Sequence, residues 1–107
     1  MTYAHKYARI ESERKFLLNS LPSNFDINRP YKLFEDTYFP RTRLRLRKVT
    51  DEKGDLIEHK LTQKYREENQ PSFETIITNI YLNENEISLM SKLSGNKIVK
   101  KRYSYLY

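Results

Sequence analysis

The chain has 107 residues, which fits one domain, and carries 20 Lys and Arg against 14 Asp and Glu, a net charge of +6. This excess indicates an anionic partner: nucleic acid, an acidic membrane surface or a phosphorylated small molecule. The absence of cysteine excludes disulfides and Cys-based zinc sites, and no apolar run approaches the roughly 18 residues of a membrane span. The first nine residues lack the apolar stretch of a signal peptide, so we expect a cytoplasmic protein without a membrane partner.

The first half of the chain has the pattern of three extended segments separated by breakers. Residues 9–18 are predicted to form a strand, and residues 19–30, which contain two prolines, a loop. Residues 31–39 are extended and rich in aromatic side chains. Pro40 ends that segment, and residues 43–49 form the next extended run.

A hairpin and a further strand follow. Residues 51–55 read as a turn with Gly54 near its tip, and residues 56–64 run back beside the preceding strand. Residues 65–72 are polar and contain a proline, which is typical of a loop. Residues 73–82 are rich in β-branched side chains and are predicted to form a strand.

One helix is predicted, over residues 84–94. Its apolar residues recur at every third position: Ile87, Met90 and Leu93. Asn83 can cap the helix, with Glu86 three residues later as in a capping box. A final strand is predicted over residues 97–105. The pattern indicates an α+β fold, mostly antiparallel sheet with one or two helices.

Four of the predicted strands place ionisable side chains on one face, because alternate residues of a strand point the same way. These residues are Glu11, Glu13 and Lys15, then Arg43, Arg45 and Arg47, then Glu58, Lys60 and Lys64, and finally Lys100 and Arg102. If the faces converge, the sheet encloses a charged cavity, which is costly to build without a ligand or counter-charges. Each run taken alone is more often an ordinary solvated strand face.

The first strand combines two carboxylates with a lysine. Glu11 and Glu13 would lie about 7 Å apart along a strand and could flank a hard cation such as Mg²⁺ or Mn²⁺. Lys15 beside them could meet an anion that the metal also contacts. Three guanidinium groups along the 43–49 strand repel one another, so they need carboxylates or phosphates opposite.

Together these features resemble the CYTH superfamily, or triphosphate tunnel metalloenzymes. Its members include class IV adenylyl cyclases, thiamine triphosphatases, inorganic triphosphatases and fungal RNA triphosphatases. Four motifs carry the resemblance, in the order the family has them: Glu11-Ser12-Glu13-Arg14-Lys15, Leu44-Arg45-Leu46-Arg47, Leu61-Thr62-Gln63-Lys64 and Val99-Lys100-Lys101-Arg102-Tyr103. Order, spacing and element type agree over nearly the whole chain.

The resemblance implies a fold, a metal and a ligand. The fold would be an antiparallel β-tunnel with its helices outside and a triphosphate in its lumen. Glu11 and Glu13, with Glu74 on the middle strand, would hold Mg²⁺ or Mn²⁺, and Lys15 would join the first two in catalysis. The phosphate oxygens would be bound by six cations: Lys15, Arg45, Arg47, Lys64, Lys100 and Arg102.

The chain departs from the family pattern in two places. The middle strand offers only Glu74 where the family usually carries an acidic pair. The predicted strands are also fewer than the family uses to close its tunnel. Residues 1–107 would therefore be a single CYTH-like domain lacking its C-terminal strands. Three alternatives follow: the chain is a fragment of a longer protein, the sheet stays open, or a second copy completes it as a homodimer through the open edge.

Several functions remain open. The first is a metal-dependent hydrolase of inorganic triphosphate, thiamine triphosphate or a nucleoside triphosphate. The second is a module that binds polyphosphate or a nucleotide without turnover, and a class IV-type adenylyl cyclase would use the same residues. Nucleic-acid binding by the basic surface is a further class, but the alternation of charge within strand faces argues against it.

Overall fold

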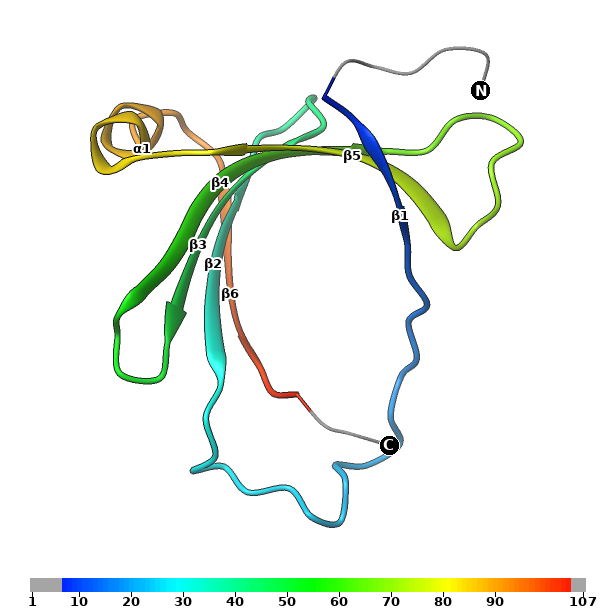
Figure 1. The fold of residues 1–107 in the computed structure, drawn as a ribbon, viewed down its shortest axis with the longest axis vertical. Coiled ribbons are helices and arrows are strands. Elements are labelled where there is room, and N and C mark those ends of the chain that lie inside the picture. Colours follow the sequence, from blue (N-terminus) through cyan, green and yellow to red (C-terminus); the bar gives the residue numbers. More distant parts are fainter. Residues whose placement is uncertain (1–6, 105–107) are drawn as a thin grey trace.

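The computed structural model describes residues 7–104, which form six strands and one helix (Figure 1). The elements are, in chain order, β1 (Arg9–Ser12), β2 (Lys32–Tyr38), β3 (Leu44–Asp51), β4 (Leu56–Tyr65), β5 (Glu74–Tyr81), α1 (Glu84–Met90) and β6 (Asn96–Arg102). This confirms the prediction of a mostly antiparallel sheet with a helix before the last strand. No helix in this part of the chain is long and apolar enough to cross a membrane.

The strands form a single sheet in the order β1-β5-β4-β3-β2-β6, and every neighbouring pair is antiparallel. Figure 1 shows that the sheet bends strongly, with β1 and β6 at opposite edges and α1 outside the bend. Within residues 7–104 these two edges are not paired with each other, so the sheet is curved but not closed.

The first strand is shorter than the sequence pattern predicted. Pairing with β5 covers only Arg9–Ser12, and one further bond runs from the Glu13 N–H to the Phe73 carbonyl at 2.8 Å. β5 begins at Glu74, so residues 13–18 continue past the end of their partner strand. Leu17 is fully exposed as a result. A segment predicted to be extended does not form a strand where no neighbouring strand supplies backbone hydrogen bonds.

Local sequence signals correctly predicted the hairpin turn and the start of the helix. The Asp51 carboxylate accepts hydrogen bonds from the N–H groups of Lys53 and Asp55, both at 2.9 Å, and Gly54 takes the left-handed conformation with φ of 89°. The predicted capping box is present, because Asn83 and Glu86 exchange side-chain to backbone bonds at 2.9 Å.

Two other elements differ in length from the prediction. The helix ends at Met90, four residues early, because Leu89 and Leu93 remain exposed and add no packing that would extend it. β6 ends at Arg102, and residue 105 of the predicted strand lies outside the described residues.

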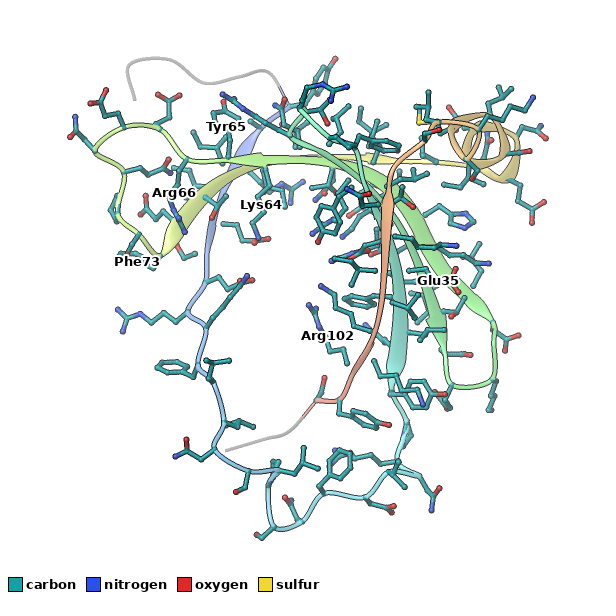
Figure 2. All side chains as sticks on the ribbon, turned by 180° about the vertical axis from the view of Figure 1, so that it is seen from behind. Glu35, Lys64, Tyr65, Arg66, Phe73 and Arg102 are labelled. Carbon is teal, nitrogen blue, oxygen red and sulfur yellow. The ribbon has the colours of Figure 1, made fainter. Side chains whose placement is uncertain are left out.

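The two faces of the sheet have different chemistry. We call the side inside the bend the inner face; Figure 2 shows Lys64 and Arg102 pointing into it and Glu35 pointing away. Buried apolar side chains lie on both faces, with Phe34 and Val49 inside and Ile76 outside. The fully buried side chains also include Asp36 and Thr62, so the centre of the inner face is polar.

Candidate functional site

Cross-strand register gathers predicted site residues on the inner face. Residues directly opposite in neighbouring strands point to the same face. Arg45 lies opposite Thr62 and Tyr38, and Arg47 lies opposite Lys60 and Asp36. By the same register the inner face carries Glu11, Lys64, Lys100 and Arg102. These charged residues therefore lie on the same face of the sheet, which the sequence pattern alone could not establish.

The middle of this face holds a buried ion-pair cluster around Asp36. Its carboxylate accepts bonds from Arg47 Nε at 2.7 Å and Arg47 Nη2 at 2.9 Å, and Lys100 Nζ lies 3.5 Å from Oδ2. Burial acts to raise the pKa of Asp36, but the hydrogen bond and charge of Arg47, together with Arg45 and Lys100, lower it below its ordinary value of 3.8. Asp36 is thus ionised at neutral pH and partly neutralises Arg47 and Lys100.

Aromatic contacts extend this cluster toward the β6 edge. The guanidinium groups of Arg102 and Arg47 lie over the Phe34 ring, 4.3 and 4.5 Å from its centroid. Three of the six predicted phosphate ligands, Arg47, Lys100 and Arg102, therefore gather around Asp36 and Phe34 and have protein partners there.

The other three predicted ligands line a separate cavity of about 390 Å³, which we call the cationic pocket. Its lining is Lys15, Tyr38, Phe39, Thr42, Arg43, Leu44, Arg45, Thr62 and Lys64, which includes four cations and no acidic residue. Arg45 Nε is buried and, within residues 7–104, has no hydrogen-bond partner. A buried, unsatisfied donor of a charged group is costly, and an anion in the pocket would satisfy it.

A smaller cavity of about 240 Å³ adjoins the cationic pocket and shares Lys15 and Lys64 with it; we call it the adjoining cavity. Glu13 and Arg66 line it. Lys64 Nζ lies 3.1 Å from a Glu11 carboxylate oxygen, and Lys15 Nζ lies 3.6 Å from one of Glu13. The two predicted metal ligands are thus each paired with a predicted phosphate ligand.

Glu74, the third predicted metal ligand, does not lie on the same face as Glu11 and Glu13. Glu74 lies opposite Ser12, while Glu11 lies opposite Thr75, so Glu74 belongs to the outer face. Among residues 7–104 no group of three or more His, Cys, Asp or Glu side chains could hold a metal ion. Two carboxylates still fit Mg²⁺ when substrate phosphates complete its coordination, which is the common way this ion is held.

Three residues in or near these cavities were missed or ranked low by sequence reasoning. Asp36 sits in an aromatic-rich strand, and only its register with Arg47 reveals its role. Arg43 lies in the pocket lining with its guanidinium 4.4 Å from the Tyr65 ring centroid. Arg66 donates to the carbonyls of Ser72 and Glu74 and so holds the 65–73 loop; Figure 2 shows it beside Phe73.

No protein-family model, curated protein or solved structure matches the chain. The CYTH resemblance therefore stays a prediction drawn from its four motifs. What the fold adds is the placement of those motifs on one curved face.

Proposed function

We propose that this protein binds the triphosphate group of a small molecule on its inner face and, with Mg²⁺ or Mn²⁺, hydrolyses it to release orthophosphate. One observation carries the proposal: the cationic pocket is lined by four cations and no acid, and the buried Arg45 Nε has no partner among the described residues. Guanidinium and ammonium groups that line a cavity whose lining holds no acidic residue fit a polyanionic ligand, which could replace Glu11 and Glu13 as the partners of Lys64 and Lys15.

The chain's own residues have separable roles in this proposal. Arg45 would donate to phosphate oxygens and stabilise charge that develops on the transferring group. A phosphate placed between Lys15 and Lys64 would draw both ammonium groups away from Glu13 and Glu11. The two carboxylates would then be available to a divalent cation, whose chemistry is to neutralise phosphate charge.

The proposal includes the fold that the resemblance implies. A strongly bent, antiparallel six-stranded sheet with Arg45, Arg47 and Lys64 on its inner face supports a part of a CYTH-type β-tunnel. β6 is exposed along its whole length, including Ile98 and Val99, and such an edge favours pairing with another strand. A second copy of this chain is one partner that could supply it.

A second candidate function is binding without turnover. It is favoured by the pairing of Glu11 and Glu13 with lysines and by the position of Glu74 on the outer face, which leave two carboxylates for a metal. A site with strong anion ligands and few metal ligands would retain a polyphosphate and hydrolyse it slowly or not at all.

Calorimetry with tripolyphosphate, with and without Mg²⁺, tests the ligand class, and phosphate release separates the two functions. Arg45→Gln should weaken binding about tenfold or more, because a charge-assisted hydrogen bond is worth about 1.5–3 kcal/mol. Lys48→Gln is the matched control, since Lys48 is an exposed cation on the outer face. Absence of binding, or equal losses in the two variants, would refute the proposed site.

A further inference from the structure

A further cavity, of about 300 Å³, lies on the outer face of the sheet beside α1; we call it the outer pocket. Figure 1 shows α1 outside the bend, and Figure 2 shows Glu35 pointing away from the inner face. Lys48 lies opposite both Glu35 and His59, so these three side chains share the outer face. The sheet therefore separates the outer pocket from the cationic pocket. Its lining is Glu35, Thr37, Leu46, Lys48, His59, Ile87, Ser91 and Lys97.

Helix α1 is attached to the sheet on both sides of its own sequence. Before the helix, the Leu82 N–H donates to the His59 carbonyl at 2.9 Å. After the helix, Gly95 packs so closely against β2 that a Cβ atom there would lie 2.6 Å from Thr37 Cγ2. Only glycine leaves room for that approach. The two attachments keep the helical side of the outer pocket next to its strand side.

His59 brings an unpaired nitrogen to the outer pocket. Its Nδ1 is buried and has no hydrogen-bond partner among residues 7–104. Burial and the charge of Lys48 lower the pKa of His59 below its ordinary value of 6.5, against the opposing effects of Glu84 and Glu35, so the ring is neutral at pH 7. A neutral imidazole can carry its proton on Nδ1 and donate it to a ligand oxygen, which would satisfy this nitrogen.

The outer pocket also holds charges of both signs that do not pair with each other. Glu35 and Lys48 lie directly opposite on β2 and β3, and Lys97 lies opposite Thr37 on β6. Within residues 7–104 none of these three charged groups takes part in an ion pair, whereas Asp36 on the inner face does. A carboxylate and two ammonium groups around one cavity suit a small ligand that itself carries both signs of charge.

Two apolar side chains complete the outer pocket. Leu46 is buried in the sheet, and Ile87 is half-buried on α1. Ile87 thus differs from Leu89, which is exposed on the same helix. A ligand with an apolar group would remove it from water against these two side chains.

We infer that the outer pocket binds a free α-amino acid with an apolar side chain. The ammonium group of this ligand would pair with Glu35. Its carboxylate would accept hydrogen bonds from Lys97 Nζ and His59 Nδ1. Its side chain would lie against Leu46 and Ile87. The inference is independent of the proposed function, because the outer pocket lies on the other face of the sheet.

The test uses leucine and three probes that each lack one part of it. Isoamylamine lacks the carboxylate, 4-methylpentanoate lacks the ammonium group, and glycine lacks the apolar side chain. In calorimetry leucine should bind, and each probe should bind at least about tenfold more weakly, because each loses one set of contacts. Leucine should also shift the ring signals of His59 in NMR spectra.

Two substitutions assign the two charged ends of the ligand. Glu35→Gln should weaken leucine binding about tenfold and leave the affinity for 4-methylpentanoate unchanged, since that probe has no ammonium group. Lys97→Gln should weaken the binding of both ligands. Glu52→Gln and Lys53→Gln are the matched controls, because both residues are exposed in the β3–β4 turn and are not part of the lining.

Three results would overturn the inference. The first is the absence of both leucine heat and a His59 shift in the wild type. The second is binding of a probe that equals the binding of leucine, since the pocket would then not recognise both charges and the side chain. The third is an equal loss of leucine affinity in Glu35→Gln and Glu52→Gln, which would place the bound leucine elsewhere on the protein.

Discussion

The guanidinium of Arg47 and the carboxylate of Asp36 form a two-point ion pair in the middle of the inner face, with Nε–Oδ1 at 2.7 Å and Nη2–Oδ2 at 2.9 Å. The Asp36 side chain is fully buried and that of Arg47 is nearly so. Arg47 is therefore already occupied by a protein anion, whereas Arg45, two residues earlier, has a buried Nε without a partner in the described chain. Two arginines of one motif thus have different roles.

Asp36→Ala should destabilise the fold by about 3–5 kcal/mol, because removing one partner of a buried pair leaves an uncompensated charge. Urea unfolding followed by circular dichroism measures this. Replacing both partners, Asp36→Leu with Arg47→Met, should cost less than the single change. Glu35→Ala, at the neighbouring outer-face position, is the control and should fall within about 1 kcal/mol of wild type. A similar cost for Glu35→Ala and Asp36→Ala would contradict the role of the pair.

The pH dependence of stability should carry the signature of Asp36. Its folded pKa lies below 3.8, so the unfolded chain takes up a proton first as the pH falls. The stabilisation from ionised Asp36 is fully present above pH 3.8 and is lost as the pH falls from there through the folded pKa. The unfolding free energy of wild type minus that of Asp36→Asn should therefore shrink below about pH 4. A difference that stays constant across this range would refute the assignment.

Local sequence signals predicted the elements that are stabilised locally. The turn at residues 51–55 and the start of α1 at Asn83 depend on side chains within a few residues, and both are confirmed. The alternation of residues 44–47 correctly placed Arg45 and Arg47 on the same face. The fold class followed from the sum of such patterns.

Features that depend on distant partners were not predictable in the same way. Residues 13–18 were predicted to continue the first strand, but β5 begins too late to pair with them. The residues next to Asp36 in the sequence do not distinguish it from a solvent-exposed aspartate. Its burial follows from the register that places Arg47 on one side and β6 on the other. The division of the cations between the Asp36 cluster and the cationic pocket has the same origin.

Glu13→Gln should reduce Mg²⁺-dependent phosphate release from ATP and tripolyphosphate at least about a hundredfold, since the loss of one carboxylate from a two-carboxylate site removes about 3 kcal/mol of stabilisation. The affinity for tripolyphosphate without metal should stay the same or increase, because the substitution releases Lys15 from its 3.6 Å ion pair with Glu13. Removal of the divalent ion with EDTA should abolish turnover of the wild type in the same way.

Glu74→Gln is the matched control for that experiment, because Glu74 lies on the outer face opposite Ser12. It should leave both turnover and binding unchanged. A loss of activity equal to that of Glu13→Gln would restore Glu74 to the metal set and argue against the position of the site on the inner face. Unchanged activity of Glu13→Gln would exclude this carboxylate as a metal ligand.

The exposed β6 edge predicts self-association that one charge can block. Val99 is 57% exposed on an edge strand whose outward backbone groups have no partner strand among residues 7–104, so a second copy can pair there. Val99→Lys should shift the protein toward the monomer in sedimentation velocity, because three further cations already lie at positions 97, 100 and 101. Leu89→Lys, on the exposed side of α1, places the same charge away from the edge and should not. Sedimentation of the wild type as a monomer at high concentration would show that β6 does not pair with a second copy.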